Sequence, residues 1–84
     1  MTNLSATLAI VSEVVKAFEA SSAIYHVSVD SVSTSIVKLN VLAMHVETHE
    51  TIEYTTYVFG DQSVEENLSM AKSSVNYLEM MVTE

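Results

Sequence analysis

The spacing of the apolar residues changes twice along this chain of 84 residues. Near the N-terminus, apolar residues recur at intervals of three and four, which places them on one face of a helix. They are Leu4, Leu8, Val11, Val15 and Phe18. The middle of the chain alternates apolar and polar residues as a strand does, and the helical interval returns from Val64 to Val82. Two helices are therefore expected on either side of a β-rich centre.

The same pattern predicts where the elements begin and end. A first helix covers about residues 4–21, three strands cover about 24–30, 35–46 and 51–59, and a second helix covers about 63–82. Ser63 and Glu66 match a capping box, in which both side chains satisfy free amides at a helix start. Short connections favour antiparallel neighbours, and both helical stripes need an apolar partner. We expect one α+β domain over residues 1–84: helix, three-stranded antiparallel meander, helix (αβββα), with both helices on one face of the sheet.

The middle strand has two unlike faces. The face expected to lie under the helices is apolar throughout and consists of Val37, Leu39, Val41 and Ala43. Pairing Val46 with Thr51 aligns this row with apolar residues of the next strand. In the first strand, alternation assigns Tyr25, Val27 and Val29 to one face. The uncovered face of the sheet is then expected to carry Ile24, Leu42, Met44, Val46, Tyr57 and Phe59.

Charge limits the partners that this chain is expected to bind. Eleven acidic residues stand against three lysines and no arginine, which gives a net charge of −8. Nucleic acids and anionic membrane surfaces both attract basic groups, so we expect no direct contact with DNA or RNA and no membrane binding. A protein partner with a basic surface fits the sign of the charge. Acidity that serves only solubility is the alternative.

The sequence contains no motif for catalysis or for a cofactor. Without cysteine there is no disulfide, no thiolate metal site and no cysteine nucleophile. One glycine is too few for a phosphate-binding loop. His45, Glu47 and His49 alternate, with His26 as a further candidate ligand, but His45 is expected on the core-facing row beside Ile52, which argues against a metal site. We expect no enzyme, no cofactor and no metal, and a cytoplasmic location because no signal peptide is recognisable.

The expected meander gathers acidic residues at two ends of the molecule. One end holds Asp30, Asp61, Glu65 and Glu66, where acids in the first turn of the second helix stabilise its dipole. The other end, which we name the acidic end, lies near all three histidines. Its members are Glu19, Glu47, Glu50, Glu53, Glu79 and Glu84. A solvated loop is one interpretation of the acidic end, and a binding surface is the other.

These features favour a protein-binding regulator or inhibitor that covers a basic surface of a protein partner, including one that otherwise holds nucleic acid. The expected contact residues are Glu47, His49, Glu50, Glu53, Leu42, Met44 and Tyr57. The alternative is a structural or chaperone-like homodimer that uses the exposed sheet face. The two edge strands carry no proline or lysine, which also favours a homodimer. Inhibitors borne by phages or plasmids and secretion chaperones share this size and acidity, an analogy of class without a common motif.

Overall fold

The computed structural model describes residues 3–84 and contains five elements. In chain order they are α1 (Leu4–Glu19), β1 (Ile24–Val32), β2 (Ile36–Met44), β3 (Thr51–Phe59) and α2 (Val64–Met81). The three strands form one antiparallel sheet in the order β1-β2-β3. The αβββα order and the antiparallel meander are therefore confirmed. The boundaries differ from the expected ones mainly at β1, which extends to Val32, and at β2, which ends at Met44.

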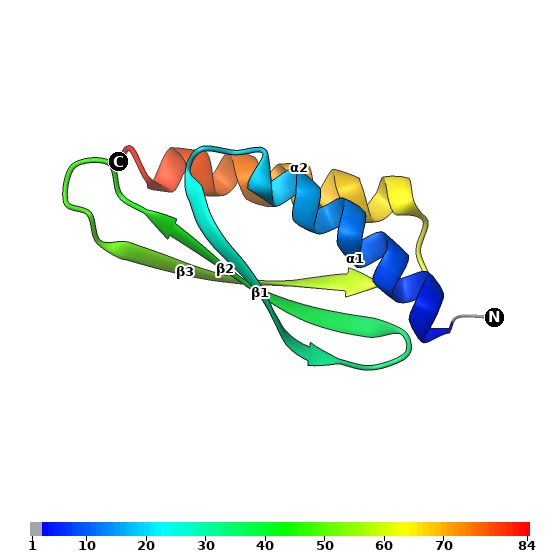
Figure 1. Cartoon of the computed structure of the whole chain (residues 1–84). Coiled ribbons are helices and arrows are strands. Elements are labelled where there is room, and N and C mark those ends of the chain that lie inside the picture. The colour runs from blue at the N-terminus through cyan, green and yellow to red at the C-terminus, as the bar shows by residue number, and fades with distance from the viewer. Residues whose placement is uncertain (1–2) are drawn as a thin grey trace.

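The molecule has two layers and an elongated outline. Both helices lie on one face of a strongly twisted sheet, and the opposite face carries no helix (Figure 1). The principal extents are 46 × 21 × 14 Å. Neither helix among residues 3–84 combines the length and the apolar composition that crossing a membrane requires.

Polar side chains define where each helix begins. The Asn3 side chain accepts a hydrogen bond from the backbone N–H of Ala6 at 2.8 Å. At the start of α2, the Ser63 hydroxyl accepts from the Glu66 N–H, and the Glu66 carboxylate accepts from the Ser63 N–H. The predicted capping box is thus confirmed. These bonds satisfy amide groups that have no carbonyl partner within a helix.

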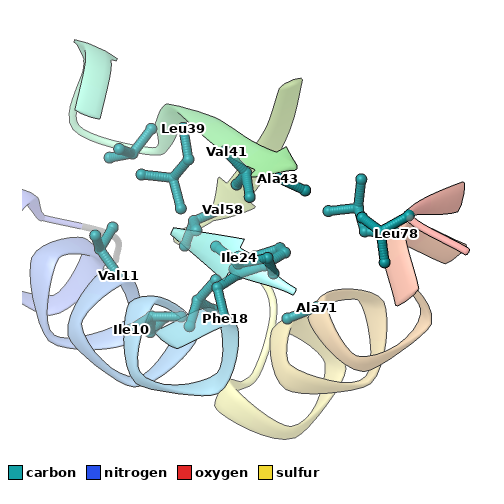
Figure 2. Packing of buried hydrophobic residues seen from close by; sticks show 13 residues of the cluster. Ile10, Val11, Phe18, Ile24, Leu39, Val41, Ala43, Val58, Ala71 and Leu78 are labelled. Carbon is teal, nitrogen blue, oxygen red and sulfur yellow. The ribbon is translucent and has the colours of Figure 1, made fainter. Parts of the chain in front are cut away.

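The core lies between the helices and the apolar row of β2 (Figure 2). Phe18 from α1 and Leu78 from α2 are fully buried, and all four residues of the β2 row are fully buried. The buried stripe of α1 lies slightly off the expected one, because Leu4 and Leu8 are exposed and Thr7 is buried. The Thr7 hydroxyl donates to the Thr34 carbonyl at 2.6 Å, so α1 is anchored to the β1–β2 turn at this point.

The predicted pairing of Val46 with Thr51 is wrong. Thr51 pairs with Met44, which places Ala43 opposite Ile52. The cause is a six-residue connection, residues 45–50, that has its own hydrogen bonds: the His45 N–H donates to the Glu50 carbonyl, and the His49 N–H donates to the His45 carbonyl. The shift equals two residues along the strand, and side chains alternate with a period of two, so the apolar rows of β2 and β3 still share one face.

The predicted alternation along β1 is wrong at the start of the strand, where a bulge interrupts it, whereas Val27 and Val29 share the face of Val41 and Leu39 as predicted. The pairing with β2 is interrupted between Ile24 and His26 and again between Val29 and Ser31. An extra residue in a strand changes which face the following side chains occupy. Ile24 is consequently buried in the core and does not lie on the uncovered face. Tyr25 is displaced from the row of Val27 and is exposed.

Candidate interaction surface

The face of the sheet without helices, named here the open face, consists of two apolar groups separated by a polar row. The strand register places Ser28, Asn40 and Thr55 side by side across the middle of this face. Apolar residues lie on either side of that row, towards the β2–β3 loop and towards the β1–β2 turn. A partner that covers the open face would therefore contact two separate apolar groups.

The apolar group near the loop adjoins a carboxylate. Leu42 pairs with Glu53 across β2 and β3, and the next pair along is Met44 with Thr51. Met44 is 41% exposed, and Glu53 is exposed. Tyr25 from β1 reaches this group, with its hydroxyl 3.3 Å from the Thr51 hydroxyl. The structure thus brings three of the expected contact residues together, and the β1 bulge adds a tyrosine that strand alternation assigns to the other face.

Tyr57 belongs to the second apolar group, at the other end of the open face. Its ring centre lies 6.3 Å from that of Phe59, and Phe59 pairs with the exposed Ile36. Four residues of extended strand, about 13 Å, separate Tyr57 from Glu53. Tyr57 also pairs with Lys38, whose ammonium lies 3.2 Å from the carboxylate of Asp30. Ile36 is an apolar member of this group that the sequence analysis did not select as a contact residue.

Hydrogen bonds connect the segments that form the acidic end. The Ser21 hydroxyl, after α1, donates to the Glu79 carboxylate at 2.9 Å. The Val46 N–H, in the β2–β3 loop, donates to the Val82 carbonyl at 2.9 Å. The loop and the end of α2 lie next to each other in Figure 1. Glu47, Glu50 and Glu53 are all exposed, and none has a lysine or histidine within salt-bridge distance among residues 3–84.

His45 holds the loop in place and does not lie on the core row as expected. Its Nδ1 accepts hydrogen bonds from the N–H groups of Glu47 and Thr48, at 3.1 and 3.2 Å. Its Nε2 lies 2.6 Å from the main-chain oxygen of Glu84. Because Nδ1 accepts, Nε2 carries the proton and donates to Glu84. His49, the other loop histidine, is exposed and has a positive φ of 61°, a backbone region that is uncommon for residues other than glycine.

Replacing His45 with alanine is expected to loosen the loop. The Glu47 and Thr48 amides lose their acceptor, and a lost hydrogen bond of this kind corresponds to about 1 kcal/mol. Amide hydrogen exchange at those two residues should accelerate about fivefold to tenfold, since 1.4 kcal/mol corresponds to tenfold. The matched control is His26→Ala, because His26 is an exposed strand residue. Equal exchange rates in both variants and in the parent chain would contradict the role assigned to His45.

The histidines and carboxylates do not assemble into a metal site. Among residues 3–84, no group of three or more His, Asp or Glu side chains lies close enough together to hold an ion. Both ring nitrogens of His45 already have hydrogen-bond partners. A surface hollow of about 460 Å³ lies beside β1 and is lined by Glu19, Ile24, Tyr25, His26 and Val27. It contains no pair of nucleophile and base that would indicate catalysis.

Asn67 has a structural role that no sequence motif indicates. Its side chain is buried, with 2% of the residue exposed, and it bonds to both backbone groups of Phe59. Oδ1 accepts from the Phe59 N–H at 2.9 Å, and Nδ2 donates to the Phe59 carbonyl at 2.9 Å. Nδ2 also donates to the Ser63 carbonyl. The amide thereby occupies the end of the β3 edge as a neighbouring strand would. An asparagine within the helical stripe of α2 is the only sequence signal of this contact.

Comparison with protein-family models, with curated proteins and with solved structures found no match to this chain.

Proposed function

We propose that this protein is a non-enzymatic regulator or inhibitor that binds a protein partner and covers a basic surface on it. The observation that carries the proposal is the contact between charge and apolar surface at the acidic end. The exposed Glu53 pairs with Leu42 and lies one pair along from the exposed Met44, and the exposed Glu47 and Glu50 belong to the loop that joins these two strands. Carboxylates without neighbouring cations fit lysine and arginine on a partner, and the apolar side chains supply area that association would bury.

The partner surface is expected to be basic over a wide area. Acidic residues also lie outside the loop and give the whole chain a net charge of −8. An approaching basic protein is therefore attracted before contact. Tyr57 provides a second anchor about 13 Å from Glu53, at the far side of the polar row. A partner that otherwise binds nucleic acid has such a surface, because phosphate binding requires clustered basic groups. In this form of the proposal the protein acts as a nucleic-acid mimic in the cytoplasm.

Binding of a basic partner is expected to weaken with salt and to depend on the carboxylates of Glu47, Glu50 and Glu53. Removing their charge in an E47Q/E50Q/E53Q variant should reduce partner affinity at least tenfold, and raising salt from about 50 to about 500 mM should do the same in the parent chain. The measurement uses the immobilised chain to recover partners, followed by titration calorimetry with the recovered partner. A matched control, E13Q/D61N/E65Q, removes three charges elsewhere and should retain affinity. Affinity that is insensitive to salt would contradict the proposal.

A homodimer that uses the open face is the second candidate function. The exposed side chains of Ile36, Met44 and Tyr57 support it, because a monomer rarely exposes a large apolar area without a partner. Replacing Leu42 and Met44 with glutamate separates the two candidates. The chain mass measured by light scattering should fall from dimer to monomer if the open face joins two copies. If the open face instead binds a foreign partner, the mass should stay unchanged and only that binding should be lost.

A further inference from the structure

We infer that two copies of this chain associate through the edge of β3. The two β3 strands pair antiparallel about a two-fold axis at Tyr54, and the two sheets join into one continuous six-stranded sheet. This contact leaves the open face uncovered, so it is distinct from the face-to-face dimer and adds to the proposed function without depending on it.

The two edges of the sheet differ in regularity. β1 is interrupted by two bulges, and bulges discourage pairing with a further strand. β3 pairs with β2 without interruption from Thr51 to Phe59. It contains no proline and no lysine, the residues that commonly protect an edge, and its one charged residue is Glu53. The edge of β3 is thus a nine-residue template for another strand.

The contacts of Phe59 and Gly60 identify the free backbone groups of β3. The Gly60 N–H donates to the Ser35 carbonyl, at the start of β2. Even-numbered residues of β3 therefore direct their backbone N–H and carbonyl groups towards β2. Backbone groups alternate along a strand, so odd-numbered residues direct theirs outward. Those of Phe59 are already bonded to Asn67. The outward groups without a strand partner are then those of Thr51, Glu53, Thr55 and Tyr57.

Only one antiparallel register uses all four free residues. With the axis at Tyr54, Thr51 pairs with Tyr57 of the second copy, and Glu53 pairs with Thr55 of the second copy. Each such pair exchanges two backbone hydrogen bonds. An axis at Thr55 would require Phe59, whose groups Asn67 occupies. An axis at Glu53 would set two carboxylates directly opposite each other, which is destabilising. The four free residues therefore pair completely with the same four residues of a second copy, and no two carboxylates lie directly opposite each other. This complete pairing favours a second copy as the added strand.

Aromatic side chains beside the edge supply surface for this contact. Tyr54 lies on the helix side of the sheet, with its hydroxyl 3.0 Å from that of Ser74. The Tyr77 ring centre lies 5.9 Å from that of Tyr54, and Tyr77 is 51% exposed. At the axis, Tyr54 faces its own copy as a non-hydrogen-bonded pair, in which side chains approach closely. Pairing of β3 would bring two tyrosines from each copy to the axis and remove part of their surface from water.

Single cysteines test the register, since the chain has none of its own. Residues at the axis have Cα atoms about 4.5 Å apart, within the range that a disulfide spans. A Tyr54→Cys variant should form a disulfide-linked dimer under mild oxidation. In a Thr55→Cys variant the two thiols belong to residues about 8 Å apart on diagonal positions, and little dimer should form. The double variant I52C/T56C retains Tyr54 and should also cross-link, because those two positions face each other across the axis.

A mass measurement tests the contact without cysteine. Light scattering of the parent chain is expected to give twice the 9.2 kDa chain mass. Thr55→Pro removes an outward N–H while the inward hydrogen bonds of β3 stay, so this variant should be a monomer with unchanged circular dichroism. Two chains of −8 repel each other, so salt should strengthen the dimer, whereas it weakens binding of a basic partner. A monomeric parent chain, cross-linking through Thr55→Cys but not through Tyr54→Cys, or pairing of β3 only with a foreign chain would overturn the inference.

Discussion

Replacing Phe18 with alanine is expected to lower the free energy of unfolding by about 3–5 kcal/mol. Phe18 is fully buried in the core between α1 and the sheet. The substitution removes an aromatic side chain from water-excluded surroundings and leaves a cavity that the rigid strands of the sheet fill only in part. A domain of this size has a total stability of about 5–10 kcal/mol, so the loss would approach half of it. Urea denaturation followed by circular dichroism measures the difference.

Leu8→Ala is the matched control for Phe18→Ala. Leu8 lies on the same helix and is 42% exposed, so its truncation should cost less than about 1 kcal/mol. If the free energy of unfolding falls with urea concentration at the same slope in both variants and in the parent chain, the difference between the variants reflects lost packing and not a changed unfolded state. Equal losses for the two variants would show that the burial of Phe18 does not govern the stability of α1 on the sheet.

Replacing Asn67 with leucine is expected to destabilise the fold by about 3 kcal/mol, although leucine is the more apolar residue. The substitution leaves the Phe59 N–H without an acceptor, and the carbonyls of Phe59 and Ser63 each lose one of two donors, keeping the N–H groups of Gln62 and of residue 67. Backbone groups removed from water cost free energy when unpaired. Thermal and urea unfolding measure the loss, and Asn76→Leu at an exposed position of α2 is the control. A variant as stable as the parent chain would mean that water replaces the amide at this edge.

Residue periodicity predicted the order of the elements and the faces of β2. The apolar row from Val37 to Ala43 is fully buried, as the alternation indicated. The capping box at Ser63 and Glu66 also formed as expected, because it depends on residues only three positions apart. Local spacing is sufficient for such features, since each one is determined within a single turn or strand.

Features that depend on contacts between distant segments were not predictable in this way. The β1 bulges interrupt the pairing of β1 with β2, and beside the first of them Ile24 lies in the core. The loop register depends on His45, whose ring bonds to loop amides and to the chain near Glu84. Asn67 bonds to backbone groups, and a sequence pattern does not reveal which backbone groups lack partners. Of the expected contact residues, Leu42, Met44 and Glu53 lie together, whereas Tyr57 lies apart because it is four residues further along β3.

The elongated outline of the molecule affects its diffusion. A chain of this length folded into a compact sphere-like body has a radius of gyration of about 12 Å. The observed value is 13.0 Å, with one principal extent more than twice either of the others. Such a particle experiences more friction than a sphere of equal mass, so it sediments slowly and leaves a gel-filtration column early. The retention volume of a single copy would therefore resemble that of a larger globular protein.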